Sequence, residues 1–169
     1  LAVFTDLAGM EGLRVDRVLL DANQARITIS QIPDKPGIAA RVFEKVAAEG
    51  IFVDMIVQSY SSGGRADLSF TATRENLADS VRVAKQLAEE MGCGEVTSGT
   101  EVAKLSVAGI GMRSHTGVAL RIFRVLSTAG INIEMVNTSE VRVNIVVAGT
   151  CGEEGLQCLQ DAFADVLVR

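Results

Sequence analysis

Aromatic and histidine side chains are scarce in this chain, and their scarcity limits its chemistry. The 169 residues contain no tryptophan, one tyrosine (Tyr60) and one histidine (His115), and aromatics make up only 4%. Nucleic-acid binding usually needs stacking aromatics on a basic face, whereas this chain carries a net charge of −5. With one histidine, a Cys–His or Ser–His–Asp site could be built in one place only. Nucleic-acid binding and an active site within this chain are therefore both disfavoured.

Cysteine and long apolar runs are also limited. The three cysteines, Cys93, Cys151 and Cys158, form no Cys-x-x-Cys pair, and their odd number favours reduced thiols in a cytoplasmic protein. No apolar run reaches membrane-spanning length, and the chain does not begin with a secretion signal. Because it starts at Leu1 without methionine, we expect either part of a longer polypeptide or a processed subunit.

What the chain does contain is an internal repeat. Residues 37–55 recur as residues 117–135, at an offset of 80, with identical residues at seven positions. Two copies of one supersecondary unit predict a pseudo-dyad with similar clefts where the copies meet. This favours a ligand-sensing module over an enzyme with one asymmetric site.

Hydrophobic periodicity predicts the order β-α-β-β-α-β in the first copy. Its expected strands are 26–32, 51–59, 66–73 and 95–97, and its expected helices are 38–49 and 75–91. The second copy has expected strands at 103–108, 131–138 and 141–147, and helices at 118–129 and 153–163. This order indicates an α+β class with two ferredoxin-like domains, each an antiparallel four-stranded sheet with helices on one face.

The second copy has little chain left for a last strand after Phe163. A spare strand at 13–20 precedes the first copy, from which a turn at 21–23 is predicted to separate it. We therefore expect this strand to complete the second sheet, so that the first domain is inserted into the second. The predicted domains are 24–98, and 12–21 together with 101–169. Because such sheets leave a face and edges uncovered, we expect a dimer.

The strand–helix junction of the first copy is predicted to bind an anion. Pro33 and Pro36 end the strand, Gly37 lets a ligand approach the backbone, and Ala39 keeps the first helical turn small. Free N–H groups and the positive end of the helix dipole favour a carboxylate there. The alternative is a tight turn with a helix cap. Asp34 is either a turn residue or a ligand for a cation beside the anion.

Acidic residues follow the helix of each copy at matching places, Asp54 and Glu134, and Glu140 follows in the second copy. Although a strand carboxylate is usually only solvated, each is predicted to lie a few ångströms from an anion-binding turn. That arrangement suits a zwitterion such as a free α-amino acid. Neutral hydrogen-bonding side chains are predicted nearby at Gln58, Ser59, Ser61, Thr138 and Ser139. The alternative is that they serve only the hairpins.

Several stretches together resemble the regulatory half of bacterial aspartokinases, from about Leu13 to Phe163. They are Asp34-Lys-Pro-Gly37, Val53-Asp-Met-Ile-Val-Gln58, Asp67-Leu-Ser-Phe-Thr71, Gly109-Ile-Gly-Met-Arg-Ser-His115, Gly130-Ile-Asn-Ile-Glu134 and Thr138-Ser-Glu140. The resemblance implies a tandem pair of ACT domains, which are small ferredoxin-like modules that bind amino acids. It also implies feedback inhibition by lysine or threonine bound between ACT units of two chains.

The resemblance implies an effector site in two parts. One unit contributes Asp34, Lys35, Pro36, Gly37, Ile38, Ala39, Phe52, Val53, Asp54, Gln58 and Ser61. The partner unit contributes Val118, Ala119, Asn132, Ile133, Ser139 and Glu140. Three residues depart from the family pattern and bear on effector identity: Phe52 in place of asparagine, Asn137 in place of serine and Thr116 in place of proline.

By this resemblance the chain is the regulatory part of an aspartokinase that senses lysine, threonine or both. We expect it to have no catalytic residues, no metal and no cofactor, since ATP and magnesium belong to the catalytic domain that it lacks. Its expected partners are the amino acid, a second copy of the chain, and the catalytic domain or α subunit; nucleic acid and membranes are not expected. The alternative is a stand-alone ACT-domain sensor that controls another protein.

Overall fold

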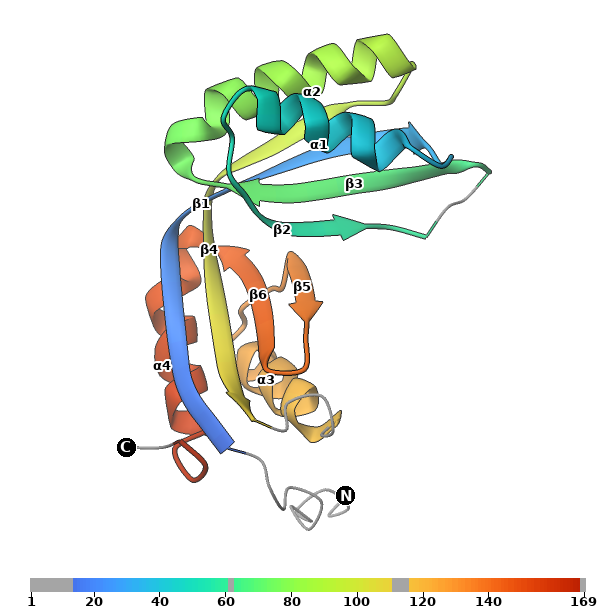
Figure 1. The fold of residues 1–169 in the computed structure, drawn as a ribbon. Coiled ribbons are helices and arrows are strands. Elements are labelled where there is room, and N and C mark those ends of the chain that lie inside the picture. The colour runs from blue at the N-terminus through green and yellow to red at the C-terminus, as the bar shows by residue number, and fades with distance from the viewer. Residues whose placement is uncertain (1–13, 61–62, 111–115, 168–169) are drawn as a thin grey trace. The chain divides into compact units, whose positions relative to one another are not determined.

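The computed structural model describes residues 14–60, 63–110 and 116–167 (Figure 1). Their strands are β1 (Arg14–Pro33), β2 (Val53–Gln58), β3 (Arg65–Ala72), β4 (Val96–Ile110), β5 (Met135–Thr138) and β6 (Arg142–Ala148). Their α-helices are α1 (Ile38–Ala48), α2 (Leu77–Met91), α3 (Thr116–Thr128) and α4 (Gly152–Ala162). Short 3₁₀ turns at Arg74–Asn76 and Gly149–Cys151 lead into α2 and α4. No helix in these ranges is both long and apolar enough to cross a lipid bilayer.

These elements form two compact units, which we call the insert unit (Asn23–Val102) and the split unit (residues 14–22 with 103–167). The strand order is β2-β3-β1-β4 in the insert unit and β1-β4-β6-β5 in the split unit. In each unit the two helices cover one face of the strands (Figure 1). The chain therefore has the α+β, ferredoxin-like architecture that the periodicity predicts.

The predicted turn at 21–23 is wrong, because β1 continues from Arg14 to Pro33. The carboxamide of Asn23 donates to Glu75 at 3.2 Å and accepts from the Arg74 backbone N–H at 3.3 Å, so it bonds to the turn before α2. The separate strands predicted at 95–97 and 103–108 are likewise one strand, β4. Hydrogen bonds to distant parts of the chain thus override the local turn signals.

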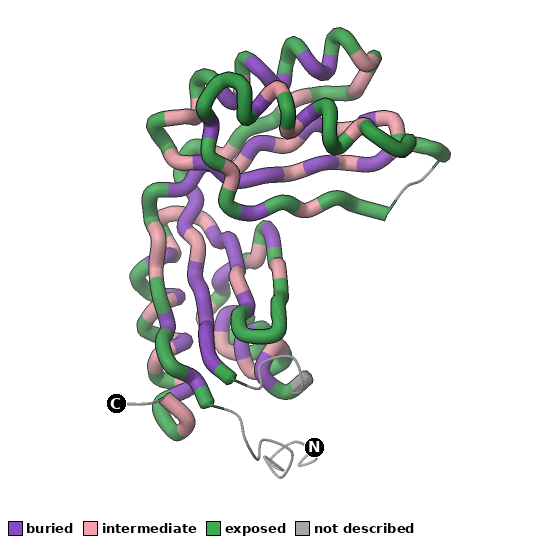
Figure 2. Tube along the Cα trace, in the orientation of Figure 1, coloured by how far each residue is buried: buried purple, intermediate pink, exposed green. Residues whose placement is uncertain are grey.

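Each unit has its own aliphatic core between sheet and helices (Figure 2). In the insert unit, alternate residues of β3 such as Leu68 and Phe70 are buried, and the ring of Phe70 meets that of Phe43 on α1 edge-to-face at 5.9 Å. In the split unit Phe163, which follows α4, is fully buried. Beyond it, the N–H of Val15 on β1 donates to the Val166 carbonyl at 3.1 Å.

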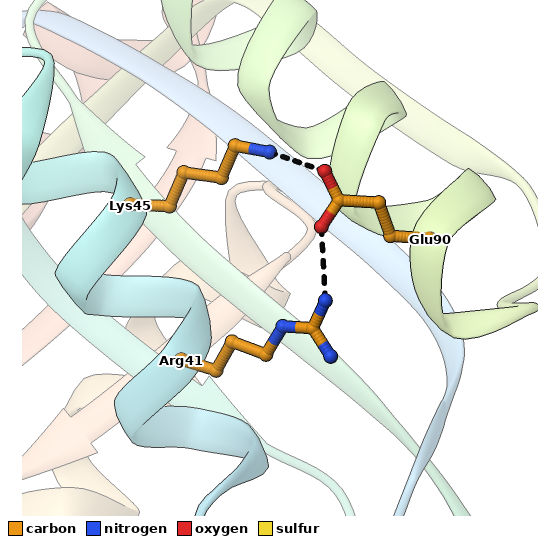
Figure 3. Close-up of polar contacts among 3 residues, drawn as sticks. All are labelled: Arg41, Lys45 and Glu90. Atoms are coloured by element: carbon orange, nitrogen blue, oxygen red, sulfur yellow. Dashed lines mark hydrogen bonds and ion pairs between the residues drawn. The ribbon is translucent and has the colours of Figure 1, made fainter.

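Ion pairs attach α1 to α2 on the outside of the insert unit (Figure 3). Glu90 accepts from Lys45 at 2.6 Å and from Arg41 at 3.0 Å. Lys45 and then Arg41 hold the pKa of Glu90 below its usual range. These contacts matter for the site, because α1 starts at the predicted anion-binding turn.

Candidate functional site

A pocket of about 440 Å³ lies at the strand–helix junction of the insert unit. Its lining consists of Ile32, Pro33, Asp34, Lys35, Pro36, Gly37, Ile38, Ala39 and Gln58. Seven of these are residues that the sequence assigns to an effector site, and they come from the turn after β1, the first residues of α1 and the end of β2. The structure therefore brings the predicted turn and Gln58 to one cavity.

The turn presents a helix N-terminus that no side chain caps. Gly37 occupies the N-cap position in a left-handed conformation, with φ of 91°, and α1 has no side-chain cap hydrogen bond. The Ile38 amide donates to the Lys35 carbonyl at 3.3 Å. The first turn of a helix carries backbone donors without helical acceptors, and the helix dipole places positive potential there. The structure thus shows a tight turn with Gly37 at the N-cap and no side-chain cap, and its open backbone donors suit an anion such as a carboxylate.

A glycine at position 37 keeps this N-terminus open. A Cβ built there would meet no other atom within 4 Å, so a side chain would project into open space rather than into the protein. The positive φ also favours glycine for backbone reasons. A larger residue would therefore change the pocket and strain the turn backbone, but its Cβ would not meet core atoms.

The structure does not bring Asp54 to this turn. Val53 pairs with Ala72 of β3, and Ala72 pairs with Ala25 near the middle of β1. Asp54 is thus level with residue 26, eight residues before Asp34, or about 26 Å away along the strand direction. The expectation that this acid lies a few ångströms from the turn is wrong within one copy of the chain. Phe52, whose side chain is 72% exposed, precedes Val53 at the same end of β2.

Two of the predicted polar side chains, Ser59 and Ser139, bond within their own hairpins. The Ser59 hydroxyl accepts from the Asp67 amide at 2.8 Å, so Ser59 serves the hairpin. Ser139 donates from its amide to the Arg142 carbonyl at 2.8 Å and from its hydroxyl to the same carbonyl at 3.4 Å. Ser61 lies outside the described residues, as do Arg113 and His115.

The residues assigned to the partner part lie in the split unit. A second pocket, of about 370 Å³, lies at the end of α3 and is lined by Phe123, Ser127, Gly130, Ile131, Asn132 and Ile133. It therefore contains the predicted Asn132 and Ile133. Glu140 is exposed and Ala119 is half-buried. Val118 is fully buried in the core, so only its backbone could meet a ligand.

The repeat is visible in burial as well as in sequence. Residues 51–60 and 131–140 have the same burial class at each of their positions, with Met55 and Met135 buried in both. By this match, Phe52 stands where Asn132 stands in the second copy. The two copies thus have the same burial pattern here, but Phe52 replaces Asn132, which lines the pocket of the split unit.

Possible metal ligands and cysteines are spread out in the described part of the chain. Within residues 14–60, 63–110 and 116–167, no three His, Cys, Asp or Glu side chains gather as metal ligands would. The cysteines are free and half-buried. Burial raises the pKa of Cys93, which opposes formation of a thiolate.

The sequence did not predict two of the pocket residues, Ile32 and Pro33. It also did not predict the contacts that hold the turn in place. Behind the turn, Arg65 and Asp67 of β3 bond to the backbone of Gln31. The alternation of Arg65 and Asp67 along one strand placed them on one face, but nothing in the sequence indicated which backbone group they bind.

Comparison with known proteins gives consistent results. A family model described as "ACT domain" matches residues 27–87 and again residues 105–163. An aspartate kinase of Pseudomonas fluorescens is 37% identical over 154 residues, covering 91% of this chain and 37% of that protein. The chain therefore spans little more than a third of that curated relative.

Two solved structures resemble this chain over nearly the whole length of both chains. The ligand-free regulatory subunit of aspartate kinase from Thermus thermophilus is 35% identical with a TM-score of 0.82, over 88% of this chain and 98% of that one. A structure described as aspartokinase alpha and beta subunits is 38% identical with a TM-score of 0.81, over 89% of this chain and 99% of that one.

Proposed function

Because the chain belongs to the regulatory region of aspartokinases, with its two ACT domains, we propose that it binds a free amino acid, threonine or lysine, and thereby controls aspartate phosphorylation. The kinase activity itself would reside in a catalytic domain or α subunit with which this chain assembles. We propose the predicted limits, 24–98 for the first domain and 12–21 with 101–169 for the second, as the two ACT domains.

The observation that carries this proposal is the uncapped N-terminus of α1 in a pocket of amino-acid size. Ligand pockets commonly enclose about 300–1,000 Å³, and this one encloses about 440 Å³. The amides at the start of α1 suit the ligand's carboxylate. Asp34 and Gln58 line the same pocket and supply oxygen acceptors for its ammonium group.

We propose that a second copy of the chain completes the site with its Asn132, Ile133, Ser139 and Glu140. The support is the resemblance together with the position of Asn132 and Ile133 at a pocket of the split unit. Lysine is a candidate because E. coli aspartokinase III, which shares the fold at 22% identity and a TM-score of 0.60, was crystallised with lysine and aspartate in a T-state. An effector of this kind controls activity only if it binds one conformation more tightly than another.

Thermal unfolding with added amino acids tests the proposal. We expect L-threonine or L-lysine to raise Tm in a concentration-dependent way, by the equivalent of about 2.7 kcal/mol at a hundred times Kd, while D-threonine has no effect. Should neither amino acid shift Tm at millimolar concentration, the proposal is wrong.

A matched pair of glycine variants tests the place of binding. Gly37→Asp puts a carboxylate at the open N-terminus of α1, so it should abolish the shift while the circular dichroism spectrum stays unchanged. Gly50→Asp is the control, because Gly50 also has a positive φ, 71°, and a Cβ added there would meet no atom within 4 Å, but it follows the other end of α1. Retained binding in Gly37→Asp, or its loss in both variants, would argue against this pocket.

A further inference from the structure

We propose that Arg65 and Asp67 of β3 are positioning residues of the pocket, because they bind both backbone groups of Gln31 and so set the point at which β1 leaves the sheet for the ligand-binding turn. The inference rests on the proposed function, which supplies the ligand. The effect of Arg65 and Asp67 on the turn itself can be tested without a ligand.

Gln31 is backbone-strained. Its φ is 56°, and within the described ranges it is the only residue other than glycine with a positive φ. The pairing of β1 with β3 slips at this point, between Ile29 and Ile32, as at a β-bulge. A non-glycine residue in the left-handed region persists only where its surroundings stabilise it. The bulge therefore needs contacts that hold it.

Two side chains of β3 supply those contacts. The Gln31 amide donates to Asp67 Oδ1 at 2.9 Å, and the Gln31 carbonyl accepts from Arg65 Nη1 at 2.8 Å. Both hydrogen bonds involve an ionised side chain, which makes them stronger than bonds between neutral groups. The same Arg65 nitrogen donates to the Gly92 carbonyl at the end of α2, at 2.7 Å. A cation is favourable at a helix C-terminus, so Arg65 connects the bulge to α2.

The bulge lies directly before the residues that line the pocket. Ile32 and Pro33 are lining residues and immediately follow Gln31. Asp34 then donates from its amide to the Gly64 carbonyl at 2.9 Å, one residue before Arg65. The end of β1 is thus held on both sides: Gln31 bonds to β3, and Asp34 bonds to the loop that precedes β3. A change at Gln31 would move the start of the turn and, with it, the amides at the N-terminus of α1.

The split unit has the same fold without side-chain bonds to a strained residue at the matching position. The match of Ile32 with Ile110 makes Gly109 the counterpart of Gln31. Gly109 has no positive φ, and its amide donates to the Val141 carbonyl at 2.9 Å in ordinary backbone pairing. The burial match of the two hairpins places Arg142 at the position of Asp67, because Leu68 pairs with Gln58 as Val143 pairs with Thr138. The carboxylate contact is therefore particular to the unit that carries the turn pocket.

The test compares Asp67→Ala with Asp67→Asn by calorimetric titration of L-threonine and L-lysine into the whole chain. Asparagine keeps an oxygen acceptor for the Gln31 amide and should bind near wild-type affinity, whereas alanine should weaken binding roughly tenfold or more, as loss of outer-shell partners does at metal sites. Arg65→Ala should weaken binding in the same way. Glu49→Ala is the control, because it removes the exposed 2.6 Å ion pair with Arg82 elsewhere in the same unit.

Amide hydrogen exchange without ligand gives a second readout. Exchange at Gln31 and Ile38, whose amides bond to Asp67 and to the Lys35 carbonyl, should accelerate in Asp67→Ala and stay near the wild-type rate in Asp67→Asn. Equal affinity in Asp67→Ala and wild type, with only Tm reduced, would show a merely structural role and overturn the inference. If the wild type binds neither amino acid, the proposed function fails, and unchanged exchange in Asp67→Ala then overturns the positioning role by itself.

Discussion

The insert unit and the split unit use the same repeated arginine with different partners. Arg41 on α1 pairs with Glu90 at 3.0 Å, and Lys45 joins it there (Figure 3). Its counterpart Arg121 on α3 binds both oxygens of Asp165, at 2.9 and 3.2 Å, and lies 5.3 Å from the centre of the Phe163 ring. The repeat thus retains a cation on the first helix, and each unit provides an acid from the second helix or just beyond it.

The second helices differ more. The 3₁₀ turns Arg74–Asn76 and Gly149–Cys151 lead directly into α2 and α4, so Leu77, Ser80 and Ala84 correspond to Gly152, Gly155 and Leu159. A Cβ on Gly155 would lie 2.7 Å from Leu105 Cδ1, and one on Gly152 would lie 3.0 Å from the Ala103 Cβ. Helix α4 therefore packs closely on its sheet through glycine, whereas α2 packs through larger side chains.

The largest expected effect comes from position 109. A Cβ on Gly109 would lie 1.9 Å from the Arg14 carbonyl oxygen, a backbone atom that cannot move aside alone. Gly109→Ala should therefore lower the free energy of unfolding by about 3 kcal/mol or more. Gln31→Ala, at the matching position of the insert unit, changes an exposed side chain and should cost less than about 1 kcal/mol. Urea unfolding measures both, and equal costs would contradict the difference between the units.

Substitutions at buried positions of the second helices should have a smaller effect. Gly155→Val crowds Leu105, and we expect a loss of about 2–3 kcal/mol from overpacking. Val83→Ala removes two methyl groups from a fully buried site of α2 and should cost about 2 kcal/mol through the cavity that it leaves. If Gly155→Val were tolerated without loss, α4 would not depend on its close approach to the sheet.

Much of this fold could be predicted because the signals are local. Apolar stripes at helical spacing placed α1 to α4 within a few residues, and the repeat supported each assignment. The continuity of β1 and β4 could not be predicted in the same way. Asn23 is a turn-forming residue by type, yet it lies within β1 and bonds to Arg74 and Glu75, some fifty residues away.

The pocket-lining turn was predictable, but the place of Asp54 was misjudged. The turn contains two prolines and a glycine, and these residues by themselves indicate an open helix N-terminus. The prediction for Asp54 rests on the acids, Asp54 and Glu134, that follow the helix at matching places in the two copies. Yet β1, α1 and β2 form a crossover in which β2 runs parallel to β1, so the start of β2 lies at the opposite end from the turn. Topological reasoning could have found this; the strained conformation of Gln31, by contrast, has no sequence signature.

The smallest expected effect concerns acid unfolding and the two arginine pairs. Hydrogen bonds from Arg121 hold the pKa of Asp165 below its usual range. A carboxyl group whose pKa is lower in the folded than in the unfolded state stabilises the fold above the unfolded value, near 4, and loses that contribution as pH falls through the folded value. Asp165→Asn should therefore make the fall of Tm below about pH 4 shallower.

Glu90→Gln is the matched variant in the insert unit, because Lys45 and Arg41 lower the pKa of Glu90 in the same sense. Both carboxylates are exposed, Glu90 to 43% and Asp165 to 50%, so each change should be modest and should shrink in high salt. Thermal unfolding between about pH 5 and 2, at low and high salt, measures it. Asp165 accepts two hydrogen bonds from the planar guanidinium of Arg121. Asp165→Asn should therefore change the acid dependence of Tm more than Glu90→Gln does. A steeper acid limb in Asp165→Asn than in wild type would mean that the carboxylate does not stabilise the fold.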